Sequence, residues 1–280
     1  MIIWLASYPK SGNTWVRSII SSLLYSNDGN FNFELMLKVS QFPEKKYFKN
    51  LINDFSNFNE IKENWILAQD MINLDNEIKI LKTHQGNYTV NKDSFTNNQN
   101  TLAKIYIVRD PRTLISSLSN HYTMTIDQAS NFLMTPQIIG NTKKWEEKET
   151  GMQCLLGKWD DHYRSWTKNK NNLLLIKYED LVQNPENELE KMINFLKKYL
   201  NFETDNIKNK KILETTSFVN LKKMEQKGLF KENVLNKKDD SKVNFFHLGP
   251  ENNWKHNLGE DIKSKIEKDF YEEMVELKYL

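Results

Sequence analysis

Apolar and polar positions along the chain follow two alternating patterns. Compact apolar runs bounded by polar residues predict buried strands at 2–7, 78–83, 103–109 and 173–177. Apolar residues recurring every three or four positions predict amphipathic helices near 14–26, 111–122, 152–168, 186–200 and 260–278. This alternation predicts an α/β fold with a mostly parallel central sheet and helices on both faces.

Three stretches, 27–65, 122–150 and 219–247, show neither pattern. Loops of such length usually form lids or binding segments, or else contain helices that the pattern does not reveal. Their large apolar side chains could line a ligand pocket or cover the core; they are Phe31, Phe33, Phe42, Tyr47, Phe48, Tyr122, Met124, Phe132 and Phe230. At 280 residues and 39% hydrophobic content, the chain is predicted to form a single domain over 1–280.

The turn between the first predicted strand and the first predicted helix carries the clearest chemical signal. Residues 8–15 read Tyr-Pro-Lys-Ser-Gly-Asn-Thr-Trp. A glycine-containing turn that opens a helix aims backbone N–H groups and the positive end of the helix dipole at one point. Lys10 adds a cation there, and Ser11 and Thr14 add hydroxyl groups. The sequence therefore predicts a P-loop-like phosphate site.

An ordinary P-loop has the form G-x-x-x-x-G-K-[ST], whereas Lys10 precedes Gly12 here and no glycine opens the turn. A kinase or NTPase also needs acidic Mg²⁺ ligands at a second strand end. No apolar run followed by such an acidic residue stands out in the sequence. Metal-free transfer of an anionic group fits this pattern better than metal-dependent phosphoryl transfer.

A second candidate site follows the third predicted strand, in Ile-Val-Arg-Asp-Pro-Arg. Asp110 is a natural N-cap and Pro111 a natural first residue of the helix that follows. Arg109 is thereby placed at the strand end, where open α/β sheets bind ligands. Ser117 lies about two turns into the helix. The alternative is an Arg-Asp pair that closes a strand without a ligand.

A third candidate site follows the second predicted strand, in Ile-Leu-Lys-Thr-His. Residues two apart on a strand face the same way, so Lys82 and His84 are expected to project together. A neutral imidazole beside an ammonium group can deprotonate a hydroxyl and neutralise charge on a transferring group. A purely structural role for His84 is the alternative.

Residues 8–15 resemble the 5′-phosphosulfate loop of the cytosolic-type sulfotransferases, Y-P-K-S-G-T-T-W, with Asn13 in place of one threonine. The donor of that family is 3′-phosphoadenosine 5′-phosphosulfate (PAPS). The resemblance implies that Lys10 neutralises the 5′-phosphate leaving group. It also implies that Thr14 and the backbone of Ser11, Gly12, Asn13 and Thr14 hold that phosphate.

Two other segments strengthen the resemblance. Lys-Thr-His resembles the family's catalytic strand end, which implies that His84 is the general base and that Lys82 contacts the sulfuryl group. Arg109 and Ser117 match the family's R-D-P…S element, which holds the 3′-phosphate of the donor. The implied reaction is in-line transfer of a sulfuryl group from PAPS to a hydroxyl or amine of a small-molecule acceptor. Its product is adenosine 3′,5′-bisphosphate (PAP), and no metal is required.

The resemblance also implies an adenine site. Trp15 follows the phosphate turn, and Thr216 and Phe218 match the family's T-S-F element, whose Thr and Phe sandwich the base with that Trp. Tyr178 matches the Y-E-D-L element, which implies that its hydroxyl reaches the adenine. A core position for Phe218 is the alternative.

The C-terminal signature of the family, F-x-R-K-G-x-x-G-D-W-K, is only partly matched. Gly249 is in place, but His247 and Leu248 replace the Arg and Lys that cover the 3′-phosphate. Each charge-assisted contact to a phosphate is worth about 1.5 to 3 kcal/mol, so the expected affinity for the donor is lower by tens-fold or more. Protonated His247, Arg17, Arg112 or a lysine of 222–242 could supply the charge, and the sequence does not choose among them.

Composition indicates which classes of partner and which cellular compartment to expect. The 39 basic and 37 acidic residues give a net charge of only +2, which disfavours nucleic acid as a partner. Cys154, the single cysteine, excludes an intramolecular disulfide and indicates a reducing compartment. No apolar stretch is long enough to span a membrane and the N-terminus does not read as a signal peptide, so we expect a cytoplasmic protein.

The sequence leaves three questions open. The family's dimerisation segment is not matched where Gly259-Glu260 stand, so the oligomeric state is undetermined. The chemical identity of the acceptor is likewise undetermined. Two other functions remain as alternatives: a protein that binds adenosine bisphosphate without transfer activity, and a P-loop kinase.

Overall fold

The computed structural model describes residues 1–140, 152–230, 232, 234–235 and 242–280. These residues form two compact units. Unit 1 comprises 1–8, 39–107 and 136–175, and unit 2 comprises 9–38, 108–135 and 176–280, apart from the gaps just given. The single domain expected over 1–280 stays a prediction.

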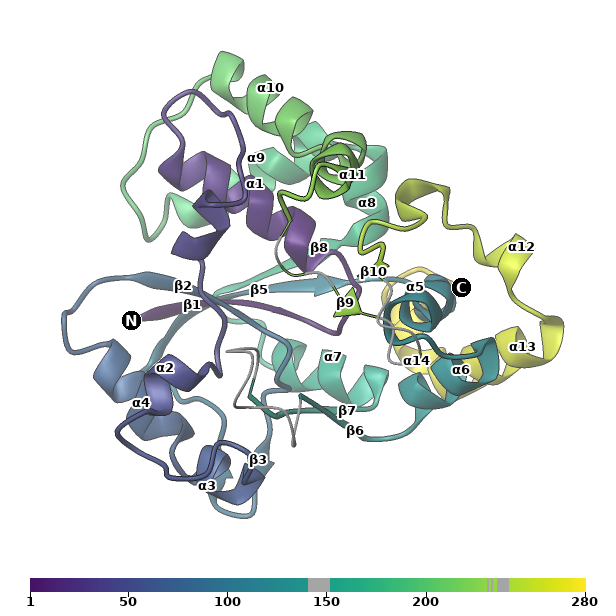
Figure 1. Cartoon of the computed structure of the whole chain (residues 1–280), viewed down its shortest axis with the longest axis horizontal. Helices are drawn as coiled ribbons and strands as arrows, with labels where there is room; N and C mark the ends of the chain where they lie inside the picture. Colours follow the sequence, from purple (N-terminus) through teal and green to yellow (C-terminus); the bar gives the residue numbers. More distant parts are fainter. Residues whose placement is uncertain (141–151, 231, 233, 236–241) are drawn as a thin grey trace. The chain divides into compact units, whose positions relative to one another are not determined.

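A four-stranded sheet organises unit 1. Its order is β2-β1-β5-β8, formed by β1 (Ile2–Ser7), β2 (Lys79–Thr83), β5 (Thr101–Val108) and β8 (Leu173–Lys177) (Figure 1). β1 runs parallel to both β2 and β5, with Leu5 opposite Lys82 on one side and Ile105 on the other. Every residue of β1 is buried, as expected of a strand covered on both faces. The predicted parallel α/β fold is confirmed.

Aromatic side chains fill the core of unit 1. Trp4 of β1 lies 5.6 Å from Phe42, 5.1 Å from Phe95 and 6.1 Å from Trp166 between ring centroids. Phe42 and Phe48 are fully buried, so these two aromatic residues of the first unassigned stretch belong to the core.

The rest of unit 1 consists of short elements around this sheet. They are α2 (Lys45–Phe48), α3 (Phe58–Glu63), α4 (Trp65–Ile72), β3 (Thr89–Val90), β4 (Asp93–Ser94), β6 (Gln137–Ile139), β7 (Cys154–Gly157) and α7 (Trp159–Thr167).

The helix predicted near 152–168 is wrong in its first part, where β7 pairs antiparallel with β6. Gly157 ends this strand with a left-handed φ of 68°, and a Cβ there would lie 2.2 Å from the hydroxyl oxygen of Tyr88. A residue in this conformation cannot continue a right-handed helix, so α7 begins only after it.

Unit 2 is mainly helical. Its elements are α1 (Asn13–Tyr25), η1 (Leu35–Lys38), α5 (Pro111–Tyr122), α6 (Ile126–Met134), α8 (Tyr178–Gln183), α9 (Pro185–Leu196), α10 (Asn206–Thr215), α11 (Phe218–Gln226), β9 (Val234–Leu235), β10 (Lys242–Val243), η2 (Gly249–Glu251), α12 (Trp254–Asn257), α13 (Glu260–Asp269) and α14 (Tyr271–Glu276). The final predicted helix is interrupted at Phe270, which leaves the helical region with φ −114° and ψ 25°.

The long unassigned stretches contain short helices and core residues. η1, α2, α3, α6 and most of α11 fall within them, and residues 141–150 of the second stretch lie outside the described residues. Phe31 and Phe230 belong to a buried cluster with Met36, Leu221 and Phe246 in unit 2. For these two aromatic residues, the role of covering the core is the one that the structure supports.

Candidate functional site

The turn after β1 is shaped by two residues with left-handed backbone, Lys10 with φ 66° and Gly12 with φ 104°. A Cβ at Gly12 would lie 2.8 Å from the ring of Tyr178, so glycine is required by both its conformation and its neighbour. Gly12 is also the N-cap of α1, and no side chain caps the helix. The positive end of the helix dipole of α1 therefore lies at this turn, where it favours an anion.

The hydroxyl of Ser11 also supports an anion site at this turn. Its Oγ is buried and has no hydrogen-bond partner among the described residues. A buried hydroxyl without a partner costs free energy, which an oxygen of a bound phosphate would recover.

Arg109 joins the two predicted phosphate sites. Its Nη1 donates to the backbone oxygen of Lys10 at 3.1 Å and to Oγ of Ser117 at 3.2 Å. Its Nε donates to Oγ1 of Thr113 at 3.0 Å, and its Cζ lies 4.1 Å from the centroid of the Tyr178 ring. The phosphate turn and the strand end with Arg109 therefore lie side by side in unit 2.

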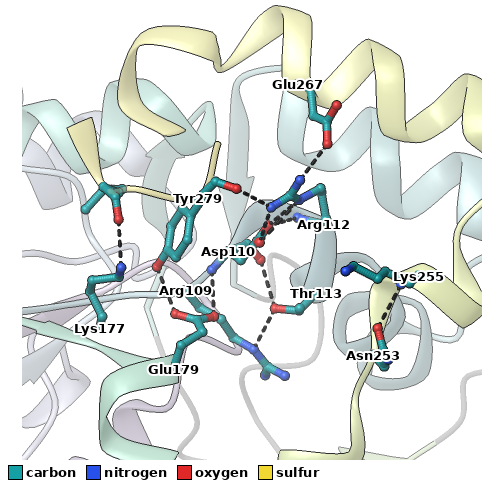
Figure 2. A network of polar contacts seen from close by, with 11 residues as sticks. Arg109, Asp110, Arg112, Thr113, Lys177, Glu179, Asn253, Lys255, Glu267 and Tyr279 are labelled. Carbon is teal, nitrogen blue, oxygen red and sulfur yellow. Dashed lines mark hydrogen bonds and ion pairs between the residues drawn. The ribbon is translucent and has the colours of Figure 1, made fainter. Parts of the chain in front are cut away.

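A network of polar contacts holds the segment that carries Arg109 (Figure 2). The side chain of Asp110 caps α5 by accepting from the N–H of Arg112, as predicted. Glu179 accepts from the N–H of Asp110 at 3.0 Å and from the hydroxyl of Tyr279 at 2.9 Å. Burial raises the pKa of Glu179, although these hydrogen bonds and the charge of Arg109 oppose that shift.

The two arginines considered as replacement cations have acidic partners. Arg112 forms ion pairs with Asp110 and Glu267, and it donates to the backbone oxygen of Tyr279 at 2.7 Å (Figure 2). Arg17 forms an ion pair with Glu232 at 2.6 Å. Their charges are therefore largely neutralised within the protein.

Two of the predicted adenine-contacting residues, Trp15 and Tyr178, are in contact. The rings of Trp15 and Tyr178 meet edge to face at 5.9 Å between centroids. Phe218 begins α11 and is half-buried, with its ring 6.0 Å from that of Phe246. Thr216 is fully buried, and its hydroxyl donates to the backbone oxygen of Ile212 at 2.7 Å.

The segment 245–252, which we call the C-terminal loop, runs from the phosphate turn to Ser117. At one end, Nζ of Lys10 lies 3.5 Å from the centroid of the Phe245 ring. At the other end, Nδ2 of Asn252 donates to Oγ of Ser117 at 3.3 Å and to the backbone oxygen of Thr113 at 2.7 Å. His247 and Leu248 lie between these two anchored ends.

Backbone geometry fixes the middle of the C-terminal loop. Gly249 has a φ of 56°, and a Cβ there would lie 2.3 Å from the Phe218 ring. Both carboxylate oxygens of the buried Glu225 accept backbone N–H groups, at 2.7 Å from Phe245 and 3.0 Å from Phe246. Partial burial and the charges of Lys222 and Lys10 lower the pKa of His247, so its imidazole is neutral at pH 7.

The candidate base belongs to unit 1. Nδ1 of His84 lies 2.8 Å from the backbone oxygen of Ser7. A carbonyl oxygen only accepts, so Nδ1 carries the proton and the neutral ring keeps its lone pair on Nε2. Lys82 is buried with 7% of its surface exposed, and its backbone N–H and oxygen bond to Ser40 and Phe42.

A buried histidine that the sequence reasoning missed holds the backbone of His84. Nε2 of His162 lies 3.0 Å from the backbone oxygen of His84, and its Nδ1 lies 2.8 Å from the hydroxyl of Tyr106. Burial lowers the pKa of His162 to about 4, so the ring is neutral, donates from Nε2 and accepts at Nδ1. The signal was present, because His162 shares the buried face of α7 with Trp159, Tyr163 and Trp166.

Cys154 is buried, and burial raises the pKa of its thiol to about 12, so the thiol is protonated and unreactive at neutral pH. Across the described part of the chain, no three His, Cys, Asp or Glu side chains are arranged to hold a metal ion. Within the same residues, no helix has the length and apolar character needed to cross a membrane.

Comparisons with known proteins agree with these features. The sequence model of the sulfotransferase domain matches residues 2–278. Sulfotransferase 1 family member D1 of Mus musculus is 26% identical over 277 residues, which cover 97% of this chain and 83% of that protein. The amine sulfotransferase of Oryctolagus cuniculus is 24% identical over 278 residues, with 97% and 80% coverage.

Two solved structures share the fold. Mouse sulfotransferase SULT7A1 complexed with PAP has a TM-score of 0.61 at 20% identity, over 98% of this chain and 84% of that one. Retinol dehydratase in complex with androsterone and PAP has a TM-score of 0.60 at 15% identity, over 98% and 80%.

Proposed function

Because the chain belongs to the sulfotransferase domain family, which matches it over residues 2–278, we propose that it transfers the sulfuryl group of PAPS to a hydroxyl or amine of a small organic acceptor. The predicted family and enzyme class are confirmed by the match to the sulfotransferase domain. The PAP held by structures of similar fold supports the predicted donor. The observation that carries the proposal is the position of Arg109, which bonds both the phosphate turn and Ser117.

The residues of unit 2 fit a nucleotide with two phosphate groups. The N-terminus of α1, the buried hydroxyl of Ser11 and the side chains of Lys10 and Thr14 suit the 5′-phosphate. Arg109 and Ser117 suit the 3′-phosphate, since a guanidinium and a hydroxyl both donate to phosphate oxygens. The rings of Trp15 and Tyr178 suit the adenine.

When bound, PAPS supplies an activated sulfuryl group whose transfer builds negative charge on the departing 5′-phosphate oxygen. In our proposal Lys10 neutralises that charge, and Lys82 contacts the sulfuryl oxygens. Nε2 of His84 accepts the proton of the acceptor, because Nδ1 is already committed to Ser7. No residue in this scheme needs a metal ion.

The proposal extends to the acceptor and to the cellular location. Similar chains include an amine sulfotransferase, and structures of similar fold hold androsterone or retinol. We propose a small hydroxylated or amine-bearing acceptor on this basis. The cytoplasmic location is supported by the single buried cysteine.

Calorimetry with PAP and with AMP tests the donor site directly. We expect clearly tighter binding of PAP, because only PAP presents a 3′-phosphate to Arg109 and Ser117. Equal affinities would contradict the assignment of this site. A panel of hydroxylated and amine acceptors then tests transfer, and tight PAP binding without sulfate transfer to any of them would favour a binding protein.

A further inference from the structure

The C-terminal loop lacks the two cations expected at its centre. His247 is neutral at pH 7 and Leu248 is apolar, yet the loop runs from Lys10 to Ser117, the two ends of the proposed donor site. A phosphate monoester carries nearly two negative charges at neutral pH. Arg109 alone neutralises only one of them, so the site as proposed is short of positive charge.

Lys222 brings a positive charge to the centre of this loop. It lies on α11, four residues after Phe218 and therefore on the same side of the helix. Its Nζ donates to the backbone oxygen of His247 at 3.1 Å and lies 5.9 Å from the centroid of the Phe218 ring. His247 is the residue that stands in the place of the missing arginine.

Lys222 differs in its partners from the two arginines that were candidate cations. Arg17 and Arg112 have acidic partners, whereas no carboxylate of the described residues forms an ion pair with Lys222. An ammonium group has three donors, and the backbone oxygen of His247 uses one of them. Considering the described residues alone, two donors and an uncompensated charge therefore remain for an anion.

We propose that Lys222 is a donor-binding residue that supplies, from α11, the charge on the 3′-phosphate which His247 and Leu248 do not provide. This inference rests on the proposed function. The lowered pKa of His247 agrees with it, since the nearby positive charges of Lys222 and Lys10 favour an anion over a second cation at this place.

The test compares Lys222→Met with Lys223→Met, a matched change at the exposed neighbour on the same helix. Calorimetry measures the Kd of PAP and of AMP for each protein. We expect Lys222→Met to weaken PAP binding about tenfold and to leave AMP binding nearly unchanged, whereas Lys223→Met changes neither. Lys222→Arg, which keeps the charge, should retain most of the preference for PAP.

The outcomes separate the inference from the function on which it rests. If the unmodified protein does not prefer PAP over AMP, both fail. If it does prefer PAP and Lys222→Met keeps the same ratio of affinities, only the assignment of Lys222 is overturned. A loss of preference in Lys222→Arg equal to that in Lys222→Met would also overturn it, because charge would then not be the cause. Thermal unfolding of each ligand-free variant shows that the fold is intact.

Discussion

At the scale of single residues, a backbone contact decides which ring nitrogen of His84 carries the proton. Nδ1–H of His84 donates to the backbone oxygen of Ser7. Nε2–H of His162 donates to the backbone oxygen of His84. The tautomer that a general base requires is therefore set by local geometry.

We expect His84→Ala to abolish sulfate transfer while leaving the Kd of PAP nearly unchanged, because His84 acts on the acceptor and not on the donor. Turnover with a sulfated product assay and calorimetry with PAP measure the two effects. His256→Ala, a change at an exposed histidine, is the control. Near-normal turnover of His84→Ala would refute the base assignment.

Gly249 is constrained by a ring as well as by its backbone angle. In Gly249→Ala the new methyl group would overlap the Phe218 ring, so we expect weaker PAP binding and a loss of stability above 1 kcal/mol, roughly the cost of the left-handed angle alone. Gly228→Ala is the matched control, because Gly228 has a φ of 76° but nothing within 4 Å of the added Cβ. Equal losses of stability and of PAP affinity in the two variants would show that the ring contact has no effect.

At the scale of elements, caps and strand ends were predictable and short helices were not. Asp110 and Pro111 start α5 as expected, because N-capping depends on neighbouring residues alone. Helices such as α2 and α3 are too short to show a period of 3.6 residues. For α6, the capping box of Thr125 and Gln128 was a usable signal that the sequence analysis did not apply.

The same distinction applies to the candidate site. Motif residues such as Lys10 and Arg109 were identified from their local sequence. Glu225 and Asn252 were not identified, and Lys222 was only one of several candidate cations. Their roles depend on which distant segments meet, and a single sequence does not encode this as a local pattern. Asn252, for example, reaches Ser117 across 135 positions of the chain.

Tyr279 contacts both α5 and α8, which gives a prediction at the scale of elements. Tyr279→Phe removes the hydroxyl that donates to Glu179, so we expect a loss of about 1 to 2 kcal/mol in the free energy of unfolding. Urea denaturation measures it. Tyr271→Phe, at a residue with 60% of its surface exposed, should change the stability by less than about 0.5 kcal/mol. An equally small effect of Tyr279→Phe would show that the network in Figure 2 does not depend on this contact.

At the scale of the whole molecule, His162 links stability to pH. Its pKa is about 4 when folded and 6.5 in the unfolded chain, so between these values the unfolded chain binds the additional proton. The contribution of His162 to stability is therefore full above pH 6.5 and is lost as the pH falls towards 4.

We expect His162→Gln, which keeps one donor and one acceptor but does not titrate, to flatten this dependence. Between pH 7 and pH 5 the free energy of unfolding of the unmodified protein should fall by about 2 kcal/mol more than that of the variant. Urea denaturation at each pH measures the difference. Parallel curves for the two proteins would contradict the assignment of the titration to His162.

The distribution of the candidate residues between the units has a practical consequence. Every residue predicted to contact the nucleotide part of the donor lies in unit 2, whereas Lys82 and His84 lie in unit 1. A mutagenesis library restricted to unit 1, with Lys82 and His84 kept unchanged, therefore alters none of the residues predicted to hold the nucleotide. Such a library leaves the predicted nucleotide-binding residues unmutated, so each round of selection begins from an enzyme whose predicted nucleotide site is intact.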